Sequence, residues 1–525
     1  MSDPGVGQGV APDRPRRIDE LARLGAEHFA DAPALVESGR SIDYRGLARA
    51  VADAAASLAR VGLGPGDRVL IVNENCAAAL VLVLAAAARD AWPVVVNARL
   101  SARELDAIRG HCSPRRAFFT IEASEEARAH AARFGAEPLP LAEAGTVAMG
   151  ARDDSAVPEP VPDDPAARVA ALIYTSGTTG APKGVMLSHS NLLFAAESGA
   201  SLRRLAPGDR VYAALPISHV FGLASVSLSA LLAGAALHCV PRFTAEGLAA
   251  ALAEDGISIL PAVPAMYARF LDHVRRTGSA VRAPRARFLY AGGAPLDAQL
   301  KAEVEAAFGQ PLHNGYGLTE TSPTVSSTLL DAPRSDLSIG PPVPGIEVRI
   351  VDGAGQEVPP GEVGELHVRG PNVMVGYYRA PQLTEEVLRG DGWFNTGDLA
   401  RQDAERNLFI AGRTKELIIR SGFNVYPIEV ESVLNQHPAV SQCAVVGRAV
   451  PGNEEVVAFC ELRAGATATA QELHAFAAER LAPYKRPAEI AVLASLPATS
   501  TGKVLKSRLR ELAARPPTGS RLAPR

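Results

Sequence analysis

Cysteine is scarce in this chain of 525 residues, which contains five. Their number is odd, no two of them form a CxxC pair, and they are scattered at Cys76, Cys112, Cys239, Cys443 and Cys460. This pattern argues against a disulfide framework and a zinc site, and it fits a reducing compartment. An excess of charge is also lacking, since 53 Lys and Arg stand against 57 Asp and Glu. We therefore predict no nucleic-acid partner and no general attraction to an anionic membrane.

The sequence also lacks a secretion signal and an uninterrupted membrane-length apolar run. Residues Met1 to Arg17 are polar and rich in Pro and Gly, without the apolar core of a signal peptide. The run Cys76–Ala88 is too short to cross a bilayer. Val220–Leu237 is long enough, but three serines and two glycines interrupt it, so we predict a buried helix there. We expect a cytoplasmic protein with no transmembrane segment.

Length and periodicity favour an α/β protein of several units. A chain of 525 residues with 47% hydrophobic residues can form two to four domains with large cores. Residues 66–73, 75–89 and 92–97 alternate strand, helix and strand, which indicates a parallel sheet covered by helices. Beyond about residue 337, short strands separated by turns predict a β-barrel-like region. After Gly412 the alternation returns, which predicts a compact α+β unit of about a hundred residues.

The segment from Tyr174 to Val185 reads YTSGTTGAPKGV and carries the strongest chemical signal. Its glycines let backbone N–H groups approach phosphate oxygens, its hydroxyls add donors, and Lys183 adds positive charge. The run 168–174 before it predicts a buried strand, and the segment from Leu192 predicts a helix. A strand, a phosphate loop and then a helix form a suitable place for a nucleotide.

The loop lacks the spacing of a Walker A motif, because Gly177, Gly180 and Lys183 follow one another at steps of three. Taken alone, it leaves an ordinary surface turn as an alternative. The loop resembles the signature of the adenylate-forming superfamily, which includes acyl-CoA synthetases, luciferase and peptide-synthetase adenylation domains. Six further segments match that family in order across roughly residues 30–510: LPISHVFG (215–222), YAGGAP (290–295), NGYGLTET (314–321), DGWFNTGD (391–398), GRTK with RSGFNVYP (412–427) and LPATSTGK (496–503).

The resemblance implies a site for ATP and Mg²⁺. Tyr316 would stack on adenine, Thr319 would bond the α-phosphate, and Asp398 with Arg413 would hold the ribose. Glu320 and Thr175 would hold Mg²⁺ through oxygen ligands. The implied ATP- and AMP-binding residues are Thr175, Ser176, Gly177, Thr178, Thr179, Gly180, Lys183, Gly293, Asn314, Gly315, Tyr316, Thr319, Asp398, Arg413 and Lys503. Without the resemblance, Glu320 is a solvated carboxylate and Asp398 a β-turn aspartate.

The resemblance also implies an acyl pocket, a CoA channel and a hinge. The pocket residues would be His219, Val220, Phe221, Gly222, Ala224, Val263 and Gly292, although a histidine such as His219 in an apolar stretch, taken alone, is more often a core histidine. Ser421 and Gly422 would bind CoA, and Lys415 would be the hinge. The implied catalytic residues are Lys503, His219, Glu320 and Thr175, with Lys503 placed between the acyl carboxylate and the α-phosphate. Taken alone, Lys503 is a solvated surface lysine.

The implied fold has a large N-terminal adenylation domain, 1–410, with two αβαβα subdomains, the phosphate loop at 174–185 and a β-rich subdomain at about 335–410. A hinge at 411–416 would lead to a small mobile α+β domain at 417–514, followed by a disordered tail at 515–525. The implied reaction activates a carboxylic acid as acyl-AMP with release of pyrophosphate and then transfers the acyl group to CoA.

The motif wording looks closest to bacterial fatty acyl-CoA ligases, so we predict a medium- or long-chain fatty acid as the substrate. Malonate-activating relatives tend to carry an arginine where this chain has Gly315, which makes a dicarboxylate a poorer candidate. The alternatives are an aryl acid of the benzoate or cinnamate type, or an acyl-AMP ligase that loads a carrier protein. A non-catalytic sensor conflicts with the presence of Lys503, Glu320 and Asp398. The sequence leaves a homodimer open.

Overall fold

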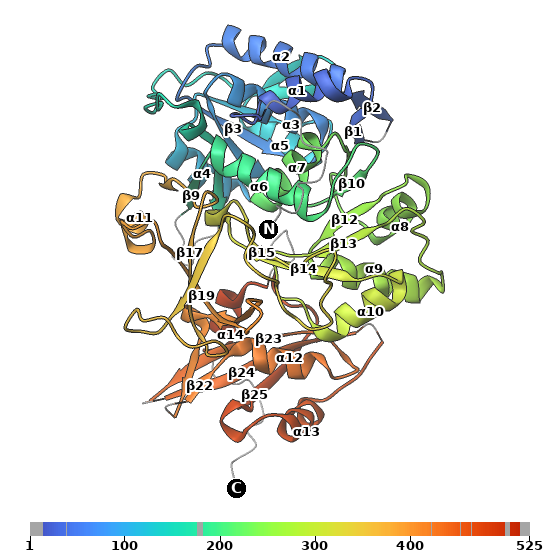
Figure 1. Ribbon diagram of the computed structural model, residues 1–525, viewed down its shortest axis with the longest axis vertical. Helices are drawn as coiled ribbons and strands as arrows, with labels where there is room; N and C mark the ends of the chain where they lie inside the picture. Colours follow the sequence, from blue (N-terminus) through green and yellow to red (C-terminus); the bar gives the residue numbers. More distant parts are fainter. Residues whose placement is uncertain are drawn as a thin grey trace, which may run out of the picture.

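The structure is a computed structural model that describes residues 14–37, 39–175, 182–421, 423–451, 453–463, 465–498 and 504–514. It has a mixed α/β fold with a large N-terminal domain and a small C-terminal domain, as predicted (Figure 1). The predicted roles of Ser176, Gly177, Thr178, Thr179, Gly180, Gly422 and Lys503, and the predicted tail 515–525, lie outside the described residues.

One eight-stranded sheet has the order β15-β14-β13-β12-β10-β11-β1-β2. Strands β14 to β1 in this order run parallel, and the edge strands β15 and β2 run antiparallel to their neighbours. The strands are β1 (Pro33–Glu37), β2 (Arg40–Asp43), β10 (Arg210–Ala213), β11 (Ala236–Cys239), β12 (Ile259–Ala262), β13 (Phe288–Ala291), β14 (Leu312–Gly317) and β15 (Thr324–Ser327).

The other eight-stranded sheet has the order β18-β9-β8-β4-β3-β5-β7-β6, and its middle strands β8, β4, β3 and β5 run parallel. The strands are β3 (Arg68–Asn73), β4 (Trp92–Asn97), β5 (Arg116–Phe119), β6 (Glu137–Leu141), β7 (Gly145–Met149), β8 (Val169–Thr175), β9 (Lys183–Ser188) and β18 (Gly376–Tyr377). The strand–helix–strand unit predicted for residues 66–97 is confirmed as β3, α3 and β4.

Helix α3 (Ala77–Ala88) is apolar on every side because it is buried on every side. It contacts β3 and β4 of one sheet and β1 of the other, so it lies between the two sheets. The remaining helices of the N-terminal domain are α1 (Glu20–Phe29), α2 (Tyr44–Arg60), α4 (Ala102–Cys112), α5 (Glu125–Arg133), α6 (His189–Leu202), α7 (Ser229–Leu232), α8 (Ala245–Glu254), α9 (Pro264–Thr277), α10 (Ala298–Phe308) and α11 (Pro381–Val387). Short 3-10 turns are η1 (Pro165–Ala167), η3 (Thr319–Thr321), η4 (Thr414–Glu416) and η5 (Pro483–Lys485).

The single helix predicted for Val220–Leu237 is wrong in extent. The segment forms a π-helix, η2 (Phe221–Leu228), continues as α7 and then enters strand β11 at Ala236. Gly234 ends the helical part with a φ of +71°, a backbone conformation that favours glycine. The predicted burial holds from Val220 to Leu237, and no described helix is long and apolar enough to span a bilayer.

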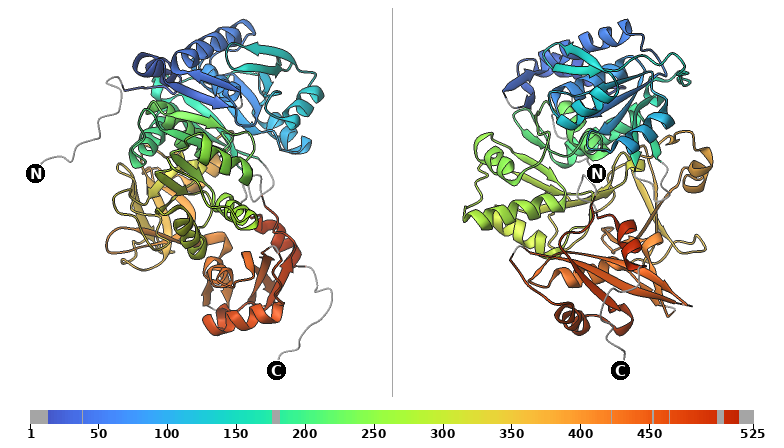
Figure 2. Two further views of the ribbon diagram at one scale, coloured as in Figure 1. Left: turned by 90° about the vertical axis from the view of Figure 1, so that its right-hand side faces the viewer. Right: turned by 180° about the vertical axis from the view of Figure 1, so that it is seen from behind.

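The β-rich region predicted after about residue 335 contains a four-stranded antiparallel sheet in the order β16-β17-β19-β20. Its strands are β16 (Glu347–Val351), β17 (Gly364–Arg369), β19 (Phe394–Gln402) and β20 (Leu408–Arg413). Beyond them lie the hairpin β21 (Ile418–Arg420) and β22 (Phe423–Val425), and a sheet of β23 (Val440–Val450), β24 (Asn453–Leu462) and β25 (Glu489–Leu493). Helices α12 (Pro427–Asn435), α13 (Ala470–Arg480) and α14 (Lys506–Ala513) pack with this sheet (Figure 2).

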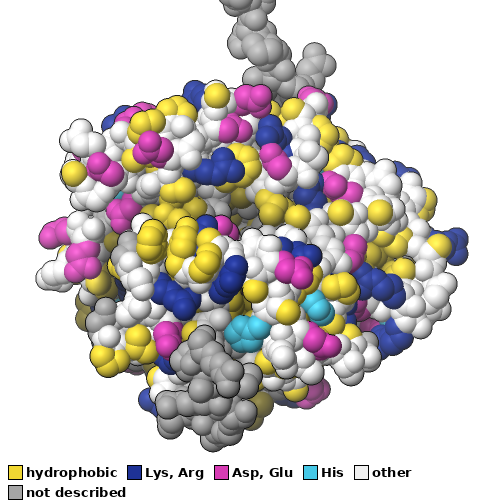
Figure 3. Space-filling model, turned by 90° about the horizontal axis from the view of Figure 1, so that it is seen from below, with side chains coloured by type: hydrophobic (Ala, Val, Ile, Leu, Met, Phe, Trp, Pro, Cys, Tyr) yellow, Lys and Arg dark blue, Asp and Glu magenta, His cyan; other side chains and the backbone are white. Residues whose placement is uncertain are grey.

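The face seen from below carries charges of both signs, interspersed with apolar side chains (Figure 3). The parallel strands matter more for function, because the loops after their carboxyl ends are where α/β sheets bind ligands. The sequence motifs follow β8, β10, β12, β13 and β14 at those ends. The topology of the two sheets thus explains why motifs far apart in the sequence gather at one site.

Candidate active site

The phosphate loop joins two antiparallel strands, with Thr175 at the end of β8 directly opposite Lys183 at the start of β9. The predicted order of strand, loop and helix is therefore wrong in one respect, since β9 intervenes and α6 begins only at His189. Strand β9 separates the loop from the N-terminus of α6, so the dipole of α6 is not directed at the loop. Among the described residues at the ends of the loop, Lys183 provides positive charge.

Tyr377 connects this loop to Glu320. Lys183 Nζ lies 5.5 Å from the centroid of the Tyr377 ring, and the Tyr377 hydroxyl donates to Glu320 Oε1 at 2.8 Å. Burial, together with the Glu320 charge, raises the pKa of Tyr377, which keeps its hydroxyl a donor. Sequence reasoning missed Tyr377, because its place depends on the pairing of β18 with β9, in which Tyr377 faces Val185.

The Glu320 carboxylate fits the Mg²⁺ role predicted for it. Mg²⁺ in nucleotide enzymes is held by one or two carboxylates together with substrate phosphates. Within the described residues, no group of three or more His, Cys, Asp or Glu side chains could hold a metal by itself. A single carboxylate beside a phosphate loop is therefore the donor set that a nucleotide-borne Mg²⁺ requires, with Thr175 remaining a predicted ligand.

A second cluster gathers the predicted ribose-binding residues. Asp398 and Arg413 face each other across β19 and β20, and Arg413 Nε lies 2.9 Å from Asp398 Oδ1. The Tyr316 hydroxyl donates to the other carboxylate oxygen of Asp398. Burial and the Asp398 charge hold the pKa of Tyr316 well above its usual value. Burial lowers the pKa of Arg413, but the charges of nearby carboxylates, above all Asp398, outweigh it and raise that pKa.

Of the other predicted nucleotide residues, Asn314 and Thr319 are buried. The Asn314 amide donates to the Ser338 carbonyl at 3.2 Å, which ties β14 to the following loop. Gly315 has no room for a side chain, because a β-carbon there would overlap the Tyr290 hydroxyl. The structure thus gives Asn314 and Gly315 packing roles, and their nucleotide contacts remain predictions.

The residues predicted to line the acyl pocket pack around Phe221 and Tyr290. The two rings meet edge to face with centroids 5.8 Å apart, and a β-carbon at Gly292 would lie 3.1 Å from Tyr290 and 3.2 Å from Phe221. The Cβ position of Gly293 is 3.6 Å from Val263 Cγ1. These residues are therefore neighbours in the fold, and their contact with an acyl group remains a prediction. Val220 and Ala224 are fully buried in the core.

Two neighbours of this pocket explain its local shape. Gly222 allows the tight approach of η2 to the preceding turn, since a β-carbon there would overlap the Leu215 and Pro216 carbonyl oxygens. His219 Nδ1 accepts from the Phe221 N–H at 3.3 Å, which holds its ring against the start of η2. Its catalytic role remains a prediction.

Arg203 is a buried residue of this region that sequence reasoning missed. It follows α6, and the pair Arg203-Arg204 after a helix indicates two solvated cations at the negative end of the helix dipole. The structure instead leaves Arg203 only 4% exposed, with its guanidinium carbon 5.3 Å from the centroid of the Tyr290 ring. Burial lowers the pKa of Arg203 to about 10.

The predicted hinge and CoA residues lie on the C-terminal side. Lys415 is exposed in η4. The Ser421 N–H donates to Asn453 Oδ1 at 2.6 Å. Lys506, the first residue of α14, lies 2.8 Å from both Glu416 and Glu431. Lys506 therefore links α14 through an ion pair to η4, the turn where the hinge is predicted.

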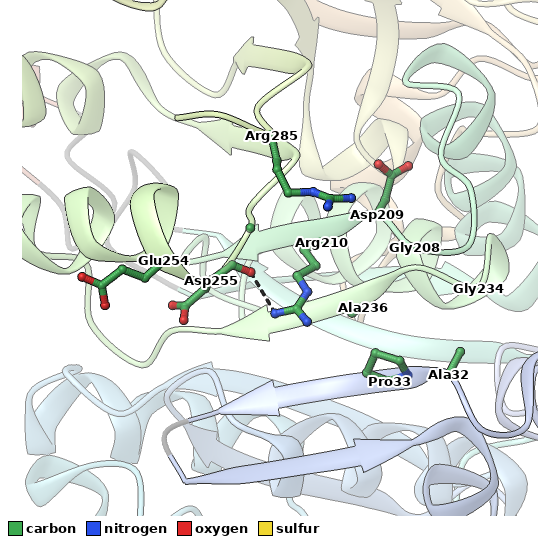
Figure 4. Close-up of a pocket in the computed structure, with 11 residues that line it drawn as sticks. Ala32, Pro33, Gly208, Asp209, Arg210, Gly234, Ala236, Glu254, Asp255 and Arg285 are labelled. Carbon is green, nitrogen blue, oxygen red and sulfur yellow. Dashed lines mark hydrogen bonds between the residues drawn. The ribbon is translucent and has the colours of Figure 1, made fainter. Parts of the chain in front are cut away.

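A separate cavity of about 390 Å³ lies away from these clusters (Figure 4). It is lined by Pro33, Arg210 and Ala236, which are the first residues of β1, β10 and β11, together with Asp255 and Arg285. Arg210 donates to the Asp255 carbonyl at 2.8 Å across it. The cavity thus opens at the amino ends of parallel strands, opposite the edge where α/β sheets bind substrates.

Comparison with known proteins agrees with this geometry. The model of the AMP-binding enzyme family matches residues 23–378, and the model of its C-terminal domain matches residues 429–503. The chain is 34% identical to a sulfoacetate–CoA ligase of Cupriavidus necator (95% of this chain, 99% of the relative) and 36% identical to a feruloyl-CoA synthase of Amycolatopsis (91% and 95%). It is 31% identical to a long-chain-fatty-acid–CoA ligase of Escherichia coli O6:H1 (96% and 95%).

The fold also matches the crystal structure of ATP-bound MatB from Rhodopseudomonas palustris. The TM-score is 0.82 and the identity 31%, over 94% of this chain and 99% of that one. The two family models together cover most of the chain. Asp398, Arg413, Lys415 and Ser421 lie between the two matched regions, and Lys506 lies just after the second. The chain belongs to the AMP-binding enzyme family and is an acid–CoA ligase that forms AMP.

Proposed function

We propose that this ligase activates a compact aromatic carboxylic acid and transfers it to CoA. The observation that supports this class is the edge-to-face contact of Phe221 with Tyr290 over Gly292. An aromatic pair beside a glycine suits a flat aromatic ring, which can add a further edge-to-face or stacked contact to the pair. An alkyl chain extending past this point would have to displace the Tyr290 ring, because its hydroxyl already lies against Gly315.

A medium- or long-chain fatty acid, the substrate predicted from the motifs, is the second candidate. The lining of Val263, Phe221 and Gly293 is apolar, which suits an alkyl chain as well as a ring. The similarity to a long-chain-fatty-acid–CoA ligase favours it too. The position of the Tyr290 ring supports the compact acid over the alkyl chain.

The proposed mechanism assigns each cluster one task. Asp398 and Arg413 hold the ribose, and Lys183 with the loop after Thr175 binds the phosphates. Glu320 would hold Mg²⁺, which when bound neutralises charge on the phosphates. An oxygen of the substrate carboxylate attacks the α-phosphorus, pyrophosphate leaves, and Lys503 offsets the charge between the two reacting groups.

In the second half-reaction the CoA thiol attacks the acyl carbon and AMP leaves. Ser421 and Gly422 would line the approach of the thiol, whereas Lys503 serves the first half-reaction. The two tasks fall on one small domain, so we propose that this domain turns about Lys415 between the half-reactions.

Mass spectrometry of the products from ATP, Mg²⁺, CoA and matched alkanoic, benzoic and cinnamic acids tests the proposal. We expect an aryl-CoA with AMP and pyrophosphate in equal amounts, formed faster than any alkanoyl-CoA. Faster turnover of alkanoates would select the fatty-acid alternative. Acyl-AMP without acyl-CoA would instead indicate a carrier protein as the acceptor.

A further inference from the structure

Arg203 is a buried cation that forms no ion pair with any carboxylate of the described residues. Its Nη2 donates to Ser225 Oγ at 2.6 Å, and its Nη1 donates to the Ser225 carbonyl. A guanidinium has five N–H donors, and both of these bonds end on one residue. Burying a charge without a counter-charge is costly, so the position calls for an explanation.

Arg68 shows how this fold satisfies a buried arginine that has only a structural task. Arg68 is 0% exposed, so it is at least as isolated from solvent as Arg203. Its three guanidinium nitrogens donate to the carbonyls of Cys112, Gly66 and Ser113, at 3.0, 2.7 and 3.1 Å. Arg203 has no such cage among the described residues, which leaves donors available for another acceptor.

The location of Arg203 identifies where that acceptor would come from. Its guanidinium lies over the Tyr290 ring, and the same ring also contacts Phe221 of the predicted acyl pocket. Ser225 follows Phe221 by four residues on η2, which is less than one turn of a π-helix, so the two lie close on one face. Arg203 and Ser225 therefore lie beside the aromatic pair, and Ser225 is farther along the chain than His219.

We propose that Arg203 and Ser225 form a polar end to the acyl pocket that binds an oxygen acceptor on the substrate, distal to the carboxylate being activated. This inference rests on the proposed function and narrows it to acids that carry such an oxygen. On an aromatic acid the oxygen would be a ring hydroxyl or a second anionic group. Arg203 is thus a specificity-determining residue that takes no part in the chemical steps.

A buried charged donor should select strongly for acids that carry the oxygen acceptor over acids that lack it. A hydrogen bond from a charged donor in a site closed to water is stronger than one between neutral groups. A site built around such a donor also rejects the analogue that lacks the oxygen, because the donor is then left buried and unpaired. We expect the oxygen-bearing acid to exceed its plain analogue by at least ~10-fold in kcat/KM.

The test compares 4-hydroxycinnamate, 4-carboxycinnamate and cinnamate with the wild type, Arg203→Met and Arg204→Met. Arg204 is the matched control, since it is exposed and pairs with Asp331 at the surface. Octanoate and 8-hydroxyoctanoate form a second pair for the case of an alkyl substrate. The readout is the ratio of kcat/KM within a pair, which is independent of how much of a variant is folded.

We expect the ratio to fall to about 1 in Arg203→Met, to stay at the wild-type value in Arg204→Met, and to survive in part in Arg203→Lys. The two substituted cinnamates tell whether a hydroxyl or an anion is preferred. A wild-type ratio near 1, or an equal loss for both members of a pair in Arg203→Met, would overturn the inference. Turnover of alkanoates alone would refute the aromatic class, while the octanoate pair would still decide the role of Arg203. Absence of every acyl-CoA would refute both.

Discussion

The Asp398 carboxylate contacts the strand-paired Arg413 and the Tyr316 hydroxyl. In the proposed reaction it also binds the ribose. The first two hold it in place before a nucleotide arrives, so little order is lost on binding. The carboxylate is 3% exposed and its position is set by two strands. Its charge should therefore matter for the nucleotide and much less for the acid.

Asp398→Asn should raise the KM for ATP and lower kcat/KM for ATP by roughly 10- to 100-fold, because charge-assisted bonds to two hydroxyls are lost. The KM for the acid at saturating ATP should change little. ATP–pyrophosphate exchange measures both constants. Asp336→Asn is the control, since Asp336 also pairs with an arginine, Arg334, but lies outside the site. An equal effect on both substrates would contradict the ribose role.

Tyr290 sets the depth of the acyl pocket in the proposed function. Tyr290→Leu should raise kcat/KM for octanoate relative to cinnamate by about 10-fold, because it removes the ring that an alkyl chain would displace and leaves apolar space. Tyr290→Phe keeps the ring and should leave the preference unchanged. Competition between the two acids, followed by mass spectrometry of the acyl-CoA products, measures the ratio. A preference that is the same in both variants would exclude Tyr290 as the limit of the pocket.

At the scale of the element, helix α6 begins with a histidine that is held neutral. The Ile18 N–H donates to His189 Nδ1 at 3.1 Å, and burial, with the nearby Arg17 charge, lowers the pKa of His189 to about 3. Asp90 opposes this shift and Arg168 adds to it. Because the start of a helix carries positive potential, a charged histidine there would also oppose the helix dipole.

The unfolded chain takes up this proton below about pH 6.5, whereas the folded chain stays neutral at His189 down to about pH 3. The stability that the neutral ring provides is therefore complete above pH 6.5 and is lost as the pH falls toward 3. We expect a loss of about 2 kcal/mol from this group between pH 6.5 and pH 5. Denaturant unfolding at several pH values measures it, and His189→Gln should flatten the slope. An unchanged slope in that variant would contradict the assignment.

Helix α14 is joined to the hinge by charge. Burial alone would lower the pKa of Lys506, but the Glu431 and Glu416 charges outweigh it and raise that pKa. Lys506→Met would leave two carboxylates together without their cation and should destabilise the C-terminal domain by about 3 kcal/mol. Lys485→Met removes a lysine that pairs with only one carboxylate, Glu429, and should cost less. Calorimetric unfolding compares the two variants. Equal losses of stability would show that pairing with two carboxylates does not make Lys506 more stabilising than Lys485.

The whole molecule combines two large sheets, whose loops form the site, with a small C-terminal sheet reached through η4 (Figure 1). The Leu417 N–H donates to the Arg413 carbonyl at 3.1 Å and closes the turn around Lys415. The domain that carries the predicted CoA residues is thus connected to the ribose cluster by a single short turn. A rotation at this turn would bring a different part of the small domain to the site.

Lys415→Pro should leave adenylation intact and lower acyl-CoA formation by at least ~100-fold, because proline fixes φ at the turn that must rotate. Rapid-quench analysis should then find acyl-AMP accumulating. Lys415→Ala keeps the rotation and serves as the control. Normal thioester turnover in the proline variant would argue against a moving hinge at this residue.

The chemistry of the site could be inferred from the chain before folding, because each motif is a continuous string whose residue types suit one ligand. The phosphate loop, the Gly315–Glu320 string and Asp398 indicated ATP and an adenylated acid through their joint resemblance to the adenylate-forming family, whereas each of them alone left a surface turn or a solvated carboxylate as the alternative. The strands of the parallel units could be predicted for the same reason, since an apolar run such as Val69–Val72 must be buried wherever it packs.

Contacts between distant strands and the burial of single charges needed the folded molecule. Tyr377 reaches Glu320 only because β18 pairs with β9, and Arg203 is buried only because η2 covers the end of α6. The sequence also cannot separate a long buried helix from a π-helix followed by a strand at residues 220–237, because both are apolar all round. The kind of reaction follows from local strings, whereas the shape and polarity of the pocket, and so the acid, depend on residues that packing alone brings together.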